Sequence, residues 1–153
     1  MSTIDRFDRK VLELLQRQGR ITNQKLAEQV ELSSAPCWRR VNRLEQDGVI
    51  TRYVALLDRE RLGLSVMVYV HVSLADHHTA TLEQFDTFVA GSDNILECYT
   101  VSGEYDYLIR VVAAGVKELE VFLMEKLLRI PAVRTANTSF VLKEKKYTTA
   151  LPV

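Results

Sequence analysis

The chain has 153 residues, of which 47 % are hydrophobic and 26 % are charged. This mixture is typical of a globular protein and excludes disordered and collagen-like chains. Lys and Arg together number 20, as do Asp and Glu. A protein that coats nucleic acid through bulk positive charge is therefore not expected, although a local basic patch can still steer a partner.

Membrane and secreted classes are also not expected. No segment has the roughly 18 consecutive apolar residues that span a bilayer, and the first residues lack the apolar core of a signal peptide. The two cysteines, Cys37 and Cys98, have the spacing of neither a metal knuckle nor a disulfide framework. The sequence predicts a soluble protein of the reducing cytoplasm without a metal or cofactor.

Residues 1–48 show the pattern of three amphipathic helices. Apolar residues recur in the first segment at spacings of three and four, which places them on one helical face: Ile4, Phe7, Val11, Leu12 and Leu15. Thr22 or Asn23 is suited to cap the second helix and Ser33 or Ser34 the third, and Gly48 is suited to end the third. A helix, a short turn and a second helix form the helix-turn-helix arrangement of DNA-binding proteins.

The third predicted helix has an apolar and a polar side. Cys37, Val41 and Leu44 fall on one side and face inward, and Trp38, which flanks them, is expected to pack between helices. Arginine can pair with guanine and asparagine with adenine, and further cations and hydroxyls can hold phosphates. The residues assigned to DNA are Ser34, Arg39, Arg40, Asn42 and Arg43. The alternative from periodicity alone is a helical unit whose arginines are only solvated.

Residues 49–57 are rich in β-branched and apolar types and predict a linker strand, followed by a turn that ends at Gly63. The sequence is therefore divided into a helix-turn-helix domain (1–50), a linker strand and turn (51–63), and a second domain (64–153).

The second domain shows strands and helices in the order β-α-β-β-α-β. The predicted elements are strands at 64–74, 94–102, 105–112 and 133–143 and helices at 81–90 and 116–130. This order is that of the ferredoxin-like α+β fold. Val66 to Leu74 alternate between an apolar face and a mixed face that carries Met67, Tyr69 and His71. The mixed face is typical of an interface, and a symmetric homodimer is the simplest expectation.

No catalytic motif is present. HExxH, GxSxG and P-loop patterns are absent from the sequence. His77 and His78 are adjacent on a predicted loop, which is poor spacing for a metal site. Glu104 and Asp106 are predicted to share one side of a hairpin turn, where the ordinary interpretation is a polar turn rather than an acid–base pair. The chain is not expected to be an enzyme.

Two stretches carry a family resemblance: Ile21 to Ile50, with Pro36-Cys37-Trp38-Arg39-Arg40-Val41 at its centre, and Val101-Ser102-Gly103-Glu104-Tyr105-Asp106-Tyr107-Leu108. Together they resemble the Lrp/AsnC family of bacterial and archaeal transcription regulators. The two motifs lie in the order and at the separation seen in that family. The resemblance extends from Asp5 to about Lys146.

The resemblance implies an N-terminal helix-turn-helix (winged-helix-like) domain, a linker strand and a C-terminal ferredoxin-like effector domain. It also implies homodimers that assemble into tetramers or octamers and an amino acid or related metabolite as effector. The residues carried over to effector binding are Ser102, Gly103, Glu104, Tyr105, Asp106, Thr138 and Ser139. Glu104 stands where the family most often has Asp, so the effector's identity is left open.

The expected function is that of a sequence-specific DNA-binding transcription regulator, cytoplasmic and nucleoid-associated, whose assembly or DNA binding responds to the effector. The alternative is an architectural DNA-binding protein that has no effector and little sequence preference. Both bind double-stranded DNA, and both should bind it less tightly as salt rises. The ratio of operator affinity to bulk-DNA affinity distinguishes them.

Overall fold

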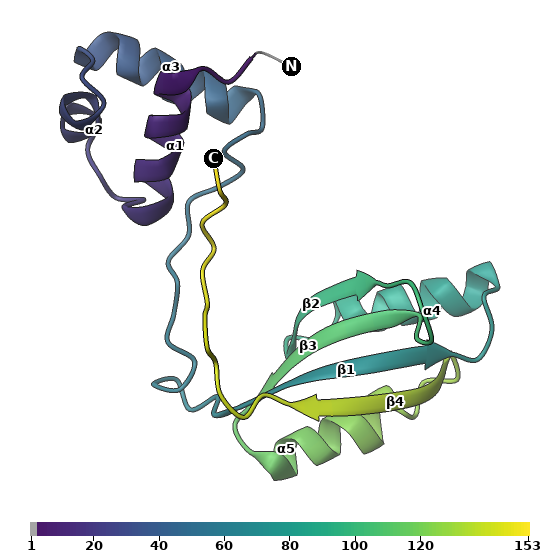
Figure 1. Cartoon of the computed structure of the whole chain (residues 1–153). Coiled ribbons are helices and arrows are strands. Elements are labelled where there is room, and N and C mark those ends of the chain that lie inside the picture. The colour runs from purple at the N-terminus through teal and green to yellow at the C-terminus, as the bar shows by residue number, and fades with distance from the viewer. Residues whose placement is uncertain (1–2) are drawn as a thin grey trace. The chain divides into compact units, whose positions relative to one another are not determined.

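Figure 1 shows the computed structural model, which describes residues 3–153. The chain forms two compact units. The first contains the residues up to Leu56 together with Lys146–Val153, and the second contains Leu57–Lys145. Each unit has its own apolar core.

The first unit contains the three predicted helices, α1 (Arg6–Arg17), α2 (Asn23–Gln29) and α3 (Ser34–Gln46). Asp5 and Asp8 form a capping box at the start of α1, in which each side chain accepts a hydrogen bond from the backbone of the other. Such a box satisfies amide groups that have no partner within the helix. The buried residues of this core are Val11, Leu12, Leu26, Ala27, Val30, Cys37 and Leu44.

The last residues of the chain belong to this first unit, whereas the sequence-based division placed them in the second domain. The side chain of Gln16 on α1 donates a hydrogen bond to Leu151 O at 3.1 Å and accepts one from Leu151 N at 2.5 Å. Val153 packs against the core of the three helices. Residues 146–153 therefore cover part of the helical unit.

The turn between α2 and α3 contains a residue in an unusual conformation. Glu31 has a φ of 59°, which is the left-handed region, and a side chain with a Cβ atom is strained there. The amide groups of Glu31 and Leu32 donate to Glu28 O and Ala27 O, respectively, at the end of α2. These bonds hold the tight turn that sets α3 against α2.

We expect Glu31→Gly to raise the stability of the helical unit by about 0.5–1 kcal/mol. Glycine adopts this conformation without the Cβ clash, and this gain exceeds the cost of the greater conformational entropy of glycine in the unfolded chain. Glu31→Ala is the matched control, since it removes the carboxylate but keeps the Cβ atom. Urea unfolding of the two variants measures the difference. Equal stability of the glycine and alanine variants would contradict a backbone origin.

The predicted linker strand does not form. Residues 51–57 are exposed and carry no strand assignment. A β-strand exists only through hydrogen bonds to a neighbouring strand, and β-branched composition alone cannot supply that neighbour. The described part of the first unit accordingly contains helices and no strand.

The second unit is the predicted split β-α-β-β-α-β fold. Its elements are β1 (Val66–Leu74), α4 (Thr79–Ala90), β2 (Ile95–Thr100), β3 (Tyr107–Ala113), α5 (Val116–Val121) with its continuation η1 (Phe122–Leu127), and β4 (Val133–Phe140). The strands form one sheet in the order β2-β3-β1-β4. All neighbouring strands are antiparallel.

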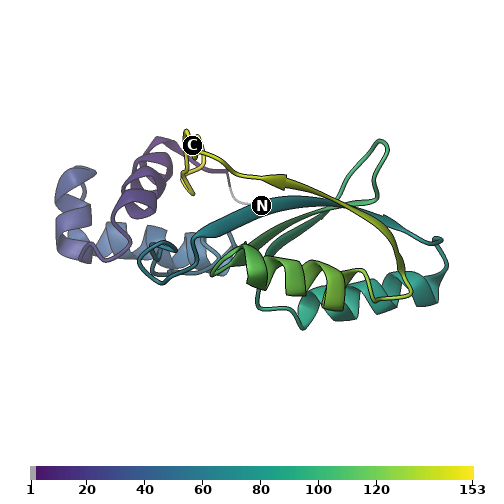
Figure 2. The ribbon, with the colours of Figure 1, turned by 90° about the horizontal axis from the view of Figure 1, so that it is seen from below.

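Both helices of this unit cover one face of the sheet (Figure 2). The apolar face of β1 faces inward, as predicted: Val68, Val70, Val72 and Leu74 are buried in the core between the sheet and the helices. On the other face Met67 and Ser73 are also buried, whereas Tyr69 and His71 are partly exposed. The face opposite the helices is therefore only partly accessible.

The second helix departs from the prediction of one α-helix over 116–130. After Val121 it widens into the π-helix η1, in which Leu128 N donates to Leu123 O at 2.9 Å. The wider turn buries both Phe122 and Leu127, which are five residues apart. Short π segments of this kind are rare and occur mostly inside α-helices, which is why periodicity did not reveal it.

Candidate functional sites

One exposed side of α3 forms the first candidate site. Ser34, Ala35, Trp38 and Arg39 are exposed and Asn42 is partly exposed. Trp38 is 57 % exposed, so the expectation that it packs between helices is wrong. An indole, a guanidinium, an amide and a hydroxyl thus lie along one helix surface, a set able to contact both bases and phosphates.

The start of α2 is attached to the start of α3 beside this surface. Asn23 Nδ2 donates to Ser34 O at 3.0 Å. Thr22 caps α2, and its Oγ1 accepts a hydrogen bond from Lys25 N at 3.3 Å. This fixes the relative position of the first turns of the two helices.

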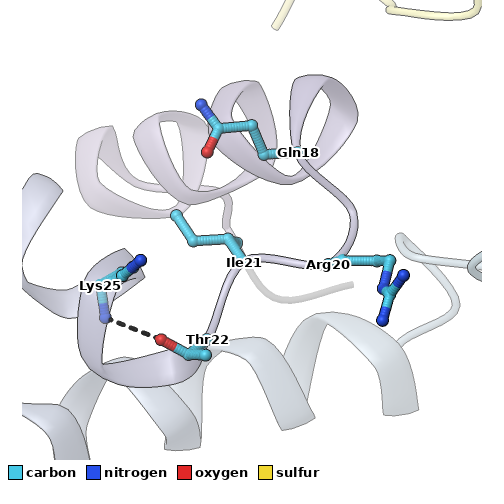
Figure 3. Close-up of a pocket in the computed structure, with 5 residues that line it drawn as sticks. All are labelled: Gln18, Arg20, Ile21, Thr22 and Lys25. Atoms are coloured by element: carbon cyan, nitrogen blue, oxygen red, sulfur yellow. Dashed lines mark hydrogen bonds between the residues drawn. The ribbon is translucent and has the colours of Figure 1, made fainter.

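A shallow hollow of about 300 Å³ lies where α1 ends and α2 begins (Figure 3). Its lining residues are Gln18, Arg20, Ile21, Thr22 and Lys25. In Figure 3 the side chain of Ile21 points towards Lys25, whereas the guanidinium of Arg20 extends away from it. The lining contains two cations and no carboxylate, so it has no acid–base pair.

The other two predicted DNA-binding arginines contact carboxylates of the first helix. Arg40 Nη1 lies 2.7 Å from Asp5 Oδ2 and 2.8 Å from Asp8 Oδ1, and Arg43 Nη2 lies 2.6 Å from Asp8 Oδ2. The side chain of Asp8 is completely buried. Arg40 and Arg43 therefore link α3 to α1, a role that the sequence pattern of α3 alone did not predict.

The hydrogen bonds among these aspartates and arginines shift the pKa values of Asp5 and Arg40. The backbone N–H of Asp8 donates to the carboxylate of Asp5, and this bond, together with the hydrogen bond from Arg40, lowers the pKa of Asp5 to about 2. The carboxylates of Asp5 and Asp8 raise the pKa of the Arg40 guanidinium. Both side chains thus stay charged at neutral pH.

A pocket of about 410 Å³ in the second unit forms the second candidate site. It lies at the junction of the β2–β3 loop with β1 and β4. Its lining residues are Ser73, Glu104, Tyr105, Arg134, Thr135, Ala136 and Asn137. A carboxylate and a guanidinium on different elements give the pocket one negative and one positive group.

The predicted effector residues differ in their relation to this pocket. Glu104 and Tyr105 line it, and Tyr105 also packs its ring on His71 at a centroid distance of 4.9 Å. Ser102 and Gly103 lie in the same loop but outside the lining, and Gly103 has a φ of 118° that favours glycine. The loop therefore brings two of its predicted residues into the pocket.

The two predicted residues of the last strand lie outside the lining of the pocket. Thr138 pairs with Val70, on the face that the helices cover. Ser139 pairs with Tyr69 on the opposite face. Sequence reasoning missed Ser73, Arg134, Thr135 and Asn137. The register between β1 and β4 places Ser73 beside Thr135 and so identifies the part of β4 that lines the pocket. The sequence alone does not define this register.

Asp106 holds the loop to β1. Its Oδ2 accepts a hydrogen bond from Leu74 N at 2.7 Å, its Oδ1 lies 2.7 Å from His77 Nε2, and its N–H donates to Val72 O. The bonds from His77 and Leu74 lower the pKa of this carboxyl. Both carboxylate oxygens are engaged, so Asp106 fixes the loop that carries Glu104 and Tyr105.

This lowered pKa predicts how the second unit responds to acid. Because the folded-state pKa of Asp106 lies below its unfolded value, its stabilisation is complete above about pH 4 and is lost as pH falls through the folded-state pKa. We expect Asp106→Asn to be less stable at neutral pH and to lose less stability on acidification. Unfolding of both proteins between about pH 6 and pH 2.5 tests this, and parallel curves would contradict it.

Metal and membrane sites are not found in the part of the chain that the structure describes. Residues 3–153 contain no group of three His, Cys, Asp or Glu side chains arranged to hold a metal ion. No helix among them is long and apolar enough to cross a bilayer.

The two units match two known domain families. Residues 4–51 match the winged helix-turn-helix DNA-binding domain, and residues 67–151 match the Lrp/AsnC ligand binding domain. The chain belongs to the Lrp/AsnC family. It is therefore a DNA-binding transcription regulator of that family, as the sequence motifs predicted.

Named relatives cover nearly the full length of this Lrp/AsnC protein. The DNA-binding transcriptional activator DecR of Escherichia coli K12 is 38 % identical over 98 % of this chain and 99 % of its own. The leucine-responsive regulatory protein of the same strain is 39 % identical over 98 % of this chain and 92 % of its own. Both names describe regulators rather than enzymes.

Solved structures show the same fold. The transcriptional regulator NMB0573 of Neisseria meningitidis, in complex with L-methionine, superposes with a TM-score of 0.95 at 38 % identity, over 98 % of this chain and 97 % of that one. AsnC of Escherichia coli superposes with a TM-score of 0.89 at 25 % identity, over 97 % and 98 %. The predicted α+β class, with an N-terminal helix-turn-helix domain and a C-terminal antiparallel sheet with helices, is thereby confirmed.

Proposed function

We propose that this Lrp/AsnC protein recognises specific DNA sites through the exposed side of α3 and that an amino acid bound in the pocket at Glu104 and Arg134 controls that binding. The observation that carries the proposal is the exposed row on α3 in a chain whose second unit matches a ligand binding domain. The solved complex of NMB0573 with L-methionine supports an amino acid as effector.

The DNA contacts are divided among the predicted residues by their exposure. In this proposal Arg39 and Asn42 contact bases, and Ser34 at the start of α3 contacts a phosphate. Trp38 joins this surface because its ring is exposed. Arg40 and Arg43 border it, with their guanidinium groups held by Asp5 and Asp8.

An amino acid zwitterion fits the charges of the pocket. Glu104 accepts the α-ammonium group, and Arg134 donates two parallel hydrogen bonds to the α-carboxylate. Ser73 and Asn137 offer further polar groups. Gly103 and Ser102 shape the loop, Asp106 anchors it to β1, and Ser139 continues the strand beyond the pocket.

We also propose that the chain forms a homodimer through the sheet face opposite the helices, which then assembles into tetramers or octamers. Tyr99 is exposed on this face, Tyr69 is partly exposed, and Glu97 forms an ion pair of 2.7 Å with Arg110 there. A partly apolar face with internally paired charges is suited to a second copy of itself. Such a dimer presents two helix-turn-helix units to two half-sites.

The protein acts as a regulator and not as an enzyme in this proposal, in the cytoplasm and at the nucleoid, where its DNA lies. The names of its relatives support a regulatory role. The competing function is that of an architectural DNA-binding protein without an effector. That function predicts similar affinity for all DNA and no response to amino acids.

Thermal unfolding with a panel of amino acids at millimolar concentration, beginning with L-methionine, tests the effector. A ligand of the folded state stabilises it by about 2.7 kcal/mol at one hundred times its dissociation constant. We expect a higher midpoint with one or a few members, abolished in Glu104→Gln and Arg134→Gln and retained in the control Glu83→Gln on α4. No shift with any amino acid, together with equal affinity for operator and bulk DNA, would favour the architectural function.

A further inference from the structure

We propose that Asp8 determines DNA specificity from inside the helical unit, because its buried carboxylate withholds Arg40 and Arg43 from DNA phosphates. Asp8 does not reach the DNA itself and is a positioning residue. The inference rests on the proposed DNA-binding face of α3. It adds a residue on α1 that neither the sequence motif nor the exposed surface identifies.

Both carboxylate oxygens of Asp8 accept hydrogen bonds. Oδ1 accepts from Arg40 at 2.8 Å, and Oδ2 accepts from Arg43 at 2.6 Å and from Asp5 N at 3.0 Å. The exposed fraction of the Asp8 side chain is 0 %. A buried carboxylate destabilises the fold unless it is paired and fully hydrogen-bonded. Moving either arginine away from Asp8 would therefore leave a buried charge without its partner.

Arg40 is held by more than Asp8. Its Nη1 also lies 2.7 Å from Asp5 Oδ2, and its guanidinium carbon lies 5.4 Å from the centre of the Phe7 ring. Only 25 % of its side chain is exposed. Moving Arg40 to a phosphate would break two ion pairs and a cation–π contact.

The position of these arginines on α3 gives the arrangement a consequence for DNA. Arg39, Arg40 and Arg43 lie within five positions of one helix, and only Arg39 lacks an ion pair among the described residues. Arginines without an ion pair could bind the phosphates of DNA of any sequence and would strengthen binding to bulk DNA. Because Asp8 pairs with Arg40 and Arg43, Arg39 is left to contact the bases of the DNA site. The same ion pairs hold α3 against α1 in one orientation.

Asp8→Asn tests this, since it keeps the size of the side chain and removes its charge. Each phosphate contact adds about 0.9 to the slope of log affinity against log salt. Asp5 still pairs with Arg40 in this variant, so Arg43 is the arginine that it releases. We expect the slope for bulk DNA to steepen by about 0.9 and the ratio of operator to bulk affinity to fall. Glu13→Gln is the control, because it removes one exposed negative charge from the same helix. A slope and a ratio equal to those of Glu13→Gln would overturn the proposal.

A second measurement keeps the test decisive if Asp8→Asn folds poorly. In the otherwise unchanged protein, Arg39→Gln should reduce the salt slope or the specificity ratio, whereas Arg43→Gln should leave the bulk-DNA slope unchanged because Arg43 is already withheld. A bulk-DNA slope that falls by about 0.9 in Arg43→Gln would show a phosphate contact and overturn the proposal. Equal operator and bulk affinities in the unsubstituted protein would instead contradict the proposed sequence-specific function.

Discussion

Phe85→Ala is expected to lower the free energy of unfolding of the C-terminal unit by about 3–5 kcal/mol. Phe85 on α4 is completely buried, and its ring packs on Tyr107 of β3 with centroids 4.6 Å apart. The substitution removes part of the apolar surface between the helix layer and the sheet and leaves a cavity there. Phe85 is among the largest fully buried side chains of the described residues.

The effect of Phe85→Ala should be confined to one unit, because the two units have separate cores. Hydrogen exchange measured segment by segment reports the opening free energy of each region. We expect faster exchange in β1 and β3 and unchanged exchange in α1 and α3. Phe140→Ala, at a position that is 50 % exposed, is the control and should have a small effect. Equal acceleration in both units would show that they unfold together.

The order and type of most elements were predictable from periodicity. The alternation of Val66 to Leu74 identified β1 and its buried side, because a strand places alternate side chains on opposite faces. The three-and-four spacing identified the helices of the first unit in the same way. These patterns are local consequences of burying one face, so a single sequence records them.

Features that depend on distant partners were not predictable. Residues 51–57 have strand composition but no neighbouring strand, and the π-helix follows from how Phe122 and Leu127 fit the core. The ion pairs of Asp8 join residues more than 30 positions apart. No spacing rule within α1 or α3 indicates that Arg43 faces a buried carboxylate.

The pocket was predictable only in part for the same reason. The motif around Gly103 identified the loop that supplies Glu104 and Tyr105. The contribution of β4 depends on its register against β1, which a slip of two residues would change without altering the face pattern. The sequence-based choice of Thr138 and Ser139 therefore missed the lining residues Thr135 and Asn137.

Arg39→Ala is expected to weaken operator binding by about 1–3 kcal/mol, or about fivefold to 150-fold, with little change in stability. Arg39 is exposed on α3, and no ion pair to it is found among the described residues. Its loss therefore leaves no buried carboxylate without a partner. DNA titration with operator and with bulk DNA, and thermal unfolding of the same samples, measure the two effects. Arg9→Ala on α1 is the control for loss of one exposed positive charge.

Arg39→Lys distinguishes base recognition from phosphate binding at this position. Lysine keeps the positive charge but lacks the planar pair of donors with which arginine contacts guanine. If Arg39 reads a base, Arg39→Lys should lose most of the operator preference while the salt slope for bulk DNA stays near that of the unsubstituted protein. If it holds a phosphate, the lysine variant should keep the preference, and sequence recognition would have to come from Asn42 and Trp38 instead.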